Sequence, residues 1–88
     1  MKTVYKYVVD CIREAVYVDI PKGGTILSAG IQGGNHVLWA LVDPDTVRHY
    51  ERVIIIAYTG DLLPPEHTWT YINTYTNGGL VYHAFEAI

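Results

Sequence analysis

The sequence predicts an all-β fold of about seven short antiparallel strands, arranged as a small sandwich or a partly closed barrel. Apolar residues recur at every second position along most of the chain, and glycine-rich turn signals separate these runs. A flat open sheet is disfavoured because it would leave both faces and two edges bare. With 88 residues the chain can form one core, so residues 1–88 are expected to be a single β domain.

The first two strands are expected over residues 4–9 and 15–20. Both runs alternate β-branched or aromatic residues with other side chains, as strands do. Asp10 ends the first strand, and Pro21 begins the turn that ends the second, because proline lacks a backbone donor. A helix over residues 10–18 is the alternative, since several apolar residues there could share one helical face.

The third and fourth strands, over residues 25–32 and 36–42, form a predicted hairpin. Between them, Gly33-Gly34-Asn35 supplies residues that tolerate the positive φ angles of tight hairpin turns. The two strands should therefore be antiparallel neighbours. Gly30 lies inside the third strand, which indicates a bulge or a close approach of two backbones.

Residues 43–59 end one strand and begin the next. Asp43-Pro44-Asp45 stops the fourth strand, and residues 46–51 show no strand pattern. This polar stretch could hold one short helical turn capped by Asp45. The fifth strand is expected over residues 52–59, where three consecutive isoleucines favour a strand over a helix.

The last two strands are expected over residues 68–76 and 80–86, after a loop that contains two prolines. Residues 68–76 alternate strictly, and Asn77-Gly78-Gly79 then forms a second hairpin turn. Strict alternation puts every second residue on the same side of a strand. The residues expected on one face are Trp69, Tyr71, Asn73 and Tyr75.

Two of these segments, residues 37–42 and 53–57, are apolar on both faces. A half-solvated antiparallel strand would carry a polar residue at every second position. Either these strands lie in the middle of a tightly wound monomeric barrel, or one face of the sheet is buried in another subunit. Because so short a chain has little material for a second covering layer, we expect a homo-oligomer.

Composition narrows the classes of partner. Six Lys and Arg residues stand against nine Asp and Glu residues, so we expect no direct binding of nucleic acid. No apolar run approaches the roughly 20 residues of a membrane helix, and the first residues do not resemble a signal peptide. Cys11 is the single cysteine and cannot form an intramolecular disulfide, which fits a reducing cytoplasm.

The sequence carries no catalytic or cofactor motif. None of the four histidines has a second histidine or a cysteine at zinc-ligand spacing, so no metal site is expected. The Gly-Gly pairs lie in turns without a following helix and therefore do not indicate a phosphate-binding loop. We expect no cofactor and a non-enzymatic protein; an enzyme built on His67, His83 and nearby acids is a third hypothesis.

Aromatic residues are the most informative candidates for a binding surface. The chain has eight tyrosines and two tryptophans, which combine large contact area with polar tips. The candidate binding residues are Trp39, Trp69, Tyr71, Tyr75, Tyr82 and His83. These rings could pack on the domain's own core, contact another protein, or stack a nucleotide.

Four segments resemble a family of short proteins encoded by tailed phages and prophages. They are residues 2–7, 20–32, 38–44 and 79–86, with Leu38-Trp39-Ala40-Leu41-Val42-Asp43-Pro44 the most characteristic. The resemblance implies a phage protein acting in the cytoplasm of a bacterial host cell. It implies no activity, because that family has none assigned.

The leading hypothesis is a non-enzymatic binding protein that stoichiometrically inhibits a host protein, such as an antiviral defence effector. The alternative is an oligomeric sponge that sequesters a nucleotide signalling molecule. In that alternative Trp39 or Trp69 would stack on the base. The phosphates would then have to meet Lys22, Arg48 and Arg52.

Overall fold

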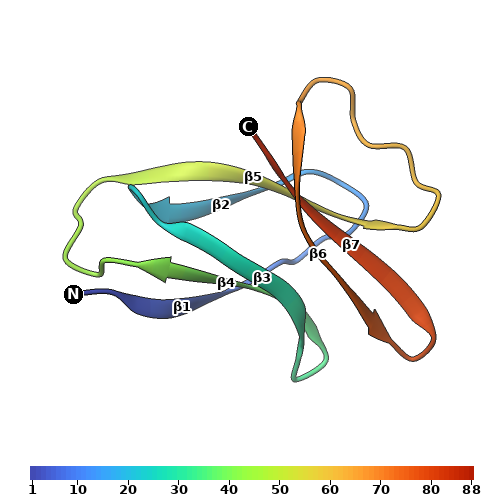
Figure 1. Ribbon diagram of the computed structural model, residues 1–88, viewed down its shortest axis with the longest axis horizontal. Coiled ribbons are helices and arrows are strands. Elements are labelled where there is room, and N and C mark those ends of the chain that lie inside the picture. Colours follow the sequence, from blue (N-terminus) through green and yellow to red (C-terminus); the bar gives the residue numbers. More distant parts are fainter.

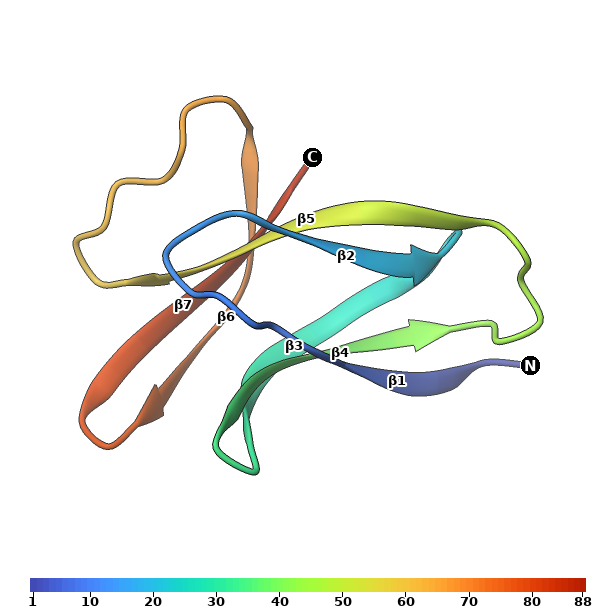
Figure 2. The ribbon, with the colours of Figure 1, turned by 180° about the vertical axis from the view of Figure 1, so that it is seen from behind.

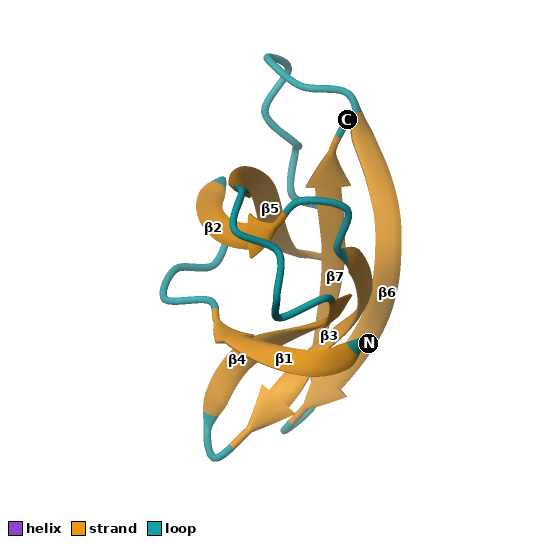
Figure 3. Ribbon diagram, turned by 90° about the vertical axis from the view of Figure 1, so that its left-hand side faces the viewer, coloured by secondary structure: helices purple, strands orange, loops and turns teal.

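The computed structural model describes residues 1–88 and contains seven strands and no helix (Figures 1 and 3). The strands are β1 (Thr3–Val8), β2 (Val16–Pro21), β3 (Thr25–Gln32), β4 (Asn35–Val42), β5 (His49–Tyr58), β6 (Trp69–Asn77) and β7 (Leu80–Ala87). The predicted all-β class is confirmed, and the architecture is a sandwich that is not closed into a barrel. With no helix present, no helical segment could cross a membrane.

Two antiparallel sheets pack face to face. One has three strands in the order β1-β4-β3, and the other has four in the order β2-β5-β7-β6. Seen from behind, β1 and β4 lie below β2 and β5, and the β5–β6 loop projects beyond the end of the sheets (Figure 2). On one side the sandwich is joined, because the Asn73 side chain of β6 hydrogen-bonds both backbone groups of Ala29 in β3.

Both predicted hairpins are confirmed. Gly33 and Gly34 connect β3 to β4 with φ angles of 57° and 81°, and Gly78 and Gly79 connect β6 to β7 with 58° and 85°. Two consecutive positive φ angles give a turn whose twist matches that of the flanking strands. Only glycine adopts this pair of conformations without steric cost, which explains the Gly-Gly signals in the sequence.

Two expectations of helical structure are wrong. Residues 46–51 hold no helical turn, because β5 begins at His49 and pairs with the end of β2. Before β5, the chain turns at Asp43, whose side chain accepts a hydrogen bond from the Asp45 N–H at 3.0 Å. The alternative helix over residues 10–18 is also absent, and its last three residues belong to β2, which pairs with β5.

Gly30 does not form the bulge that the sequence predicts at this position. The bulge of β3 lies between Ile26 and Ser28, where the pairing register with β4 shifts. A Cβ atom at Gly30 would lie 3.0 Å from the Trp39 ring, so the glycine leaves room for the indole on the outer surface of the three-stranded sheet. The close approach is therefore between a backbone and a side chain.

The core lies between the two sheets and consists of apolar residues from both. Its buried members are Val9, Val18, Ile20, Ala29, Leu38, Ala40, Val42, Ile54, Ile56, Tyr82 and Ala84. At its margin Arg52 points inward and pairs with Glu86, Nη2 donating to Oε1 at 3.0 Å. Arg52 Nη1 also donates to the Gly24 carbonyl at 2.8 Å, so its guanidinium stabilises the β2–β3 turn.

For β5, the argument that an apolar strand needs a second subunit to cover it does not hold. Ile55 and Ala57 face away from the core, yet both are buried within the single chain. Residues of the β1–β2 link, including Ile12, and of the β5–β6 loop, including Leu62, lie beside them. The outward-facing side of this part of β5 is therefore buried without a second subunit.

Candidate functional site

A bulge in β6 divides the aromatic face that strict alternation predicts. The register with β7 shifts between Tyr71 and Asn73, and the extra residue is Ile72. Ile72 packs against the core, so the residues before and after it point to opposite sides. Trp69 and Tyr71 therefore lie on the outer surface of the four-stranded sheet, while Asn73 and Tyr75 face inward, and the single-face prediction is wrong.

Tyr75 and Tyr82 lie on the inner side of the sheet. Their rings stack at 5.4 Å and 26°, and His36 packs edge-on against Tyr82 at 4.6 Å. Tyr75 Oη lies 2.8 Å from His36 Nδ1. Burial raises the pKa of both phenols and lowers the pKa of His36, so all three groups are neutral near pH 7. This cluster packs one end of the sandwich.

Trp39 lies on the outer surface of the three-stranded sheet. Its indole rests on Gly30, and its neighbours across the strand pairs are Lys6 and Ser28. Trp39 is thus on the opposite side of the sandwich from Trp69 and Tyr71. The structure does not bring the two tryptophans together.

The remaining predicted residues gather on the outer surface of the four-stranded sheet. We call this surface the outer aromatic face and define it as Trp69, Tyr71, His83 and Phe85. Tyr71 is 58% exposed and packs edge-on against Phe85, with ring centroids 5.7 Å apart. Trp69 is held by a hydrogen bond from Nε1 to the Pro64 carbonyl at 2.9 Å.

A chain of hydrogen bonds orients this face. Thr59 Oγ1 lies 2.6 Å from His83 Nε2, and Thr74 Oγ1 lies 2.9 Å from His83 Nδ1. Thr74 Oγ1 also lies 2.8 Å from Tyr71 Oη. Because a hydroxyl both donates and accepts, the imidazole is satisfied at both nitrogens in either neutral tautomer. Tyr71 is therefore exposed but held in place at its hydroxyl.

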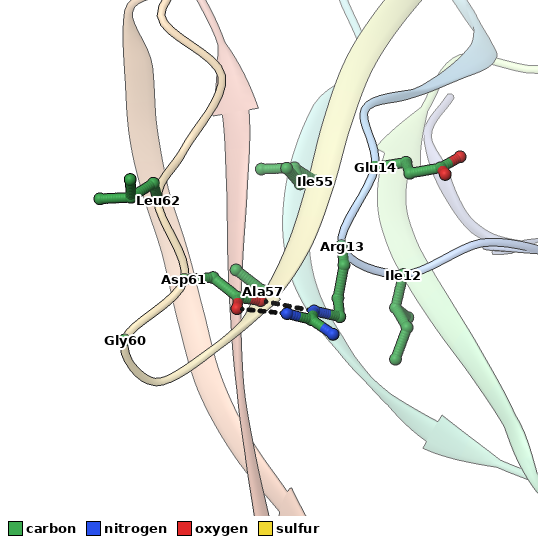
Figure 4. A pocket seen from close by; sticks show the side chains of 8 residues that line it. All are labelled: Ile12, Arg13, Glu14, Ile55, Ala57, Gly60, Asp61 and Leu62. Carbon is green, nitrogen blue, oxygen red and sulfur yellow. Dashed lines mark hydrogen bonds and ion pairs between the residues drawn. The ribbon is translucent and has the colours of Figure 1, made fainter.

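A groove of about 580 Å³ opens broadly to solvent (Figure 4). A smaller pocket shares Ala57, Gly60 and Asp61 with it and extends to His83 and Phe85 of the outer aromatic face. The residues that line the groove are Ile12, Arg13, Glu14, Ile55, Ala57, Gly60, Asp61 and Leu62. Arg13 and Asp61 face each other across it, and two hydrogen bonds of 3.0 and 2.9 Å join the guanidinium to the carboxylate. This pair ties the β1–β2 link to the β5–β6 loop.

The Arg13–Asp61 pair has three further supports. Asp61 Oδ2 accepts the Tyr58 N–H at 3.0 Å, and the Arg13 guanidinium lies 5.2 Å from the Tyr58 ring centroid. The Arg13 N–H donates to the Ile56 carbonyl, and the residue adopts a φ of 69°, a region that non-glycine residues rarely occupy. The hydrogen bonds from Arg13 and Tyr58 lower the pKa of Asp61.

Arg13 is hydrogen-bonded to Asp61 at the groove, and Tyr71 and His83 are each hydrogen-bonded to Thr74 on the face. No buried side-chain nitrogen or oxygen lacks a hydrogen-bond partner. No group of three or more His, Cys, Asp or Glu residues is placed to hold a metal ion.

The family described as a domain of unknown function, DUF7352, matches residues 1–88. The chain belongs to the DUF7352 family. No curated protein and no solved structure matches it. Membership assigns neither an activity nor a phage origin, so the function of this DUF7352 chain is argued from its own surface.

The residues of the nucleotide-sponge alternative are scattered in the DUF7352 structure. Arg52 is engaged by Glu86 and the Gly24 carbonyl, which leaves its guanidinium little capacity for a phosphate. Lys22 of the β2–β3 turn donates its backbone N–H to the carbonyl of Arg48, in the β4–β5 connection, at 2.8 Å. That turn is on another part of the molecule from the outer aromatic face, and no observation favours a nucleotide site.

Sequence reasoning missed the Arg13–Asp61 pair and Phe85 of this DUF7352 chain. Arg13 and Asp61 are 48 positions apart, so no local pattern could connect them. Phe85 could have been predicted, because it is two residues from His83 in β7 and therefore lies on the same face of that strand. The bulge at Ile72 could not have been predicted, because the alternation of residues 68–76 is unbroken at that position.

Proposed function

We propose that this protein is a non-enzymatic protein-binding domain, and that its partner docks on the outer aromatic face. The observation that carries the proposal is Tyr71, which is 58% exposed although its hydroxyl is hydrogen-bonded to Thr74. An aromatic ring that is already ordered loses little conformational entropy when a partner covers it. Tyrosine and tryptophan residues of this kind are typical of interface hot spots.

The surroundings favour a protein over a small ligand. Small-molecule sites enclose most of the ligand in a deep pocket, whereas the groove beside the face is open. Leu62 projects from the β5–β6 loop almost fully exposed, and Val81 lies on the same face of β7 as His83 and Phe85. A partner surface could cover Tyr71 and these aliphatic side chains together, which would bury a continuous apolar area.

For the partner we propose a bacterial host protein, with antiviral defence effectors as the first class to test. Support comes from the resemblance of the sequence to short phage proteins. A binding protein without catalytic groups acts by occupying its target, so inhibition would be stoichiometric. The same proposal places the protein in the cytoplasm of the host cell.

The experiment uses the tagged protein as bait in a bacterial host lysate, with two matched tyrosine variants. Tyr71→Ala removes the ring on the outer aromatic face, and Tyr50→Ala removes an equally accessible ring, 49% exposed, near the other end of the same sheet. We expect one host protein to bind the wild type and Tyr50→Ala but not Tyr71→Ala. Thr74→Val, which frees the Tyr71 hydroxyl, should weaken capture several-fold through lost preorganisation.

Two results would contradict this function. One is recovery of background proteins alone by the wild type. The other is equal capture by the wild type and Tyr71→Ala. A thermal-shift screen with linear and cyclic nucleotides is a separate check, because a bound ligand raises the melting temperature. An increase of several degrees would favour the nucleotide sponge over a protein partner.

A further inference from the structure

The outer edge of β1 has no hydrogen-bond partner in the protein. β1 pairs only with β4, and no backbone group of residues 3–8 makes a hydrogen bond to any other segment. Half of the backbone N–H and C=O groups of an edge strand point away from its neighbour. In β1 these groups are available to another strand.

The other three edges of the two sheets carry features that oppose such pairing. β3 has a bulge at Leu27, and the Asn73 side chain accepts a hydrogen bond from its Ala29 N–H. β6 has a bulge at Ile72. β2 carries Asp19 and ends in Pro21, which has no backbone donor. β1 has no proline and no bulge, and Lys6 is its one charged residue.

We infer that a second copy of this chain pairs with β1 in antiparallel orientation, giving a dimer with one continuous six-stranded sheet. A two-fold axis perpendicular to the sheet relates the two copies and keeps their core-facing sides together. This inference does not depend on the proposed function, because β1 belongs to the three-stranded sheet and the outer aromatic face to the other.

Charge selects the register. A two-fold axis at Tyr5 places Val4 opposite Lys6 of the partner subunit and Tyr5 opposite the partner's Tyr5. An axis at Lys6 would place that lysine opposite the partner's Lys6, and an axis at Val4 would place Lys2 opposite the partner's Lys6. Like charges directly opposite each other are destabilising. Among the registers with the two-fold axis at residue 4, 5 or 6, only the one centred on Tyr5 places no lysine opposite another lysine.

The same register buries the apolar side chains that β1 leaves exposed. Val4 and Val8 are 51% and 49% exposed, and Tyr5 is 40% exposed, on opposite faces of the strand. In the dimer Val8 lies opposite the partner's Lys2, whose aliphatic stem can cover it. Backbone hydrogen bonds and these contacts together form a small interface, so the dimer should be concentration-dependent.

The test changes the charge at position 4 and follows dimer dissociation by light scattering and sedimentation over a concentration series. Val4→Glu places a carboxylate opposite Lys6 of the partner subunit, and we expect it to tighten the dimer about five-fold. Val4→Lys places like charges opposite each other and should weaken it by a similar factor. Adding K6E to Val4→Lys places opposite charges across the seam again and should tighten the dimer to about the level of Val4→Glu.

Matched controls carry the same charges away from the edge. Val47→Glu and Val47→Lys alter a residue that is 94% exposed in the β4–β5 connection, and neither should change the dissociation constant. Circular dichroism and melting temperature confirm that each variant is folded. A single-chain mass at every concentration would overturn the inference, and so would a dimer equally sensitive to charge at Val4 and Val47.

Cross-linking tests the register independently. In a Cys11→Ser background, Tyr5→Cys should form a disulfide-linked dimer on mild oxidation, because residue 5 lies opposite itself across the axis. Lys6→Cys and Tyr17→Cys, the latter on the edge of β2, should cross-link far less. Preferential cross-linking through Lys6→Cys or Tyr17→Cys would overturn the proposed pairing.

Discussion

The Asn73 side chain binds the Ala29 backbone as a neighbouring strand would. Its Oδ1 accepts the Ala29 N–H at 2.8 Å, and its Nδ2 donates to the Ala29 carbonyl at 2.9 Å. The bulge at Ile72 turns Asn73 inward to make these bonds and leaves Tyr71 on the outside. One backbone irregularity thus joins the two sheets and creates the outer aromatic face.

Asn73→Ala should destabilise the protein by about 2 kcal/mol, because it leaves two backbone groups of buried Ala29 without partners. Asn73→Asp should cost at least as much, since a carboxylate has no donor and would face the Ala29 carbonyl. Urea unfolding measures both, and amide exchange at Ala29 should accelerate in each variant. A cost below about 0.5 kcal/mol for Asn73→Ala would show that the bonds contribute little.

Replacement by alanine should reduce the stability of the protein by very different amounts at Gly24 and at Gly30. A Cβ at Gly24 would lie 2.7 Å from Ile20 Cγ2 and 3.1 Å from the Pro21 carbonyl, and Ile20 is fully buried. Gly24→Ala should therefore cost about 2 kcal/mol or more through overpacking. At Gly30 the added atom meets only the partly exposed Trp39 ring, so Gly30→Ala should cost less and shift the tryptophan fluorescence. Equal costs would contradict these packing environments.

Asp61 should make stability depend on pH. Hydrogen bonds from Arg13 and from the Tyr58 N–H hold the pKa of Asp61 below its ordinary value of 3.8. A depressed carboxyl pKa contributes stability that is fully present above 3.8 and is lost as the pH falls through the folded-state pKa. The urea midpoint of Asp61→Asn should thus lie below that of the wild type at neutral pH. A difference that persists at strongly acidic pH would contradict the assignment.

His36 should add a second dependence at higher pH. Burial lowers the pKa of its imidazole from 6.5, so the unfolded chain binds this proton more tightly than the folded one. Stability should therefore fall as the pH drops below 6.5. His36→Asn keeps a polar group near Tyr75 but does not titrate, and it should flatten this slope. A slope that His36→Asn leaves unchanged would argue against His36.

The fold could be predicted from sequence because its signals are local. Gly33-Gly34 and Gly78-Gly79 mark the hairpins, and alternation marks the strands that they connect. The start of β5 was missed because its first residues are polar and exposed, and their strand pairing comes from β2. A prediction from neighbouring residues cannot identify a pairing strand that is distant in the sequence.

The candidate site was only partly predictable for the same reason. Trp69, Tyr71 and His83 meet on one face, but the bulge at Ile72 moves Tyr75 to the other side. That bulge accompanies bonds between Asn73 and Ala29, which are 44 positions apart. Ile55 and Ala57 face away from the core and are nevertheless buried within one chain, so alternation alone indicated a missing subunit where none is needed.

The most direct test of the outer aromatic face is site-specific photo-cross-linking in host cells. A benzoylphenylalanine replaces Tyr71 in one variant and Tyr50 in a matched variant, both accessible rings of the same sheet. We expect position 71 to give one discrete cross-linked band containing a host protein and position 50 to give none. No cross-link at position 71, or the same products at both positions, would contradict a binding role for this face.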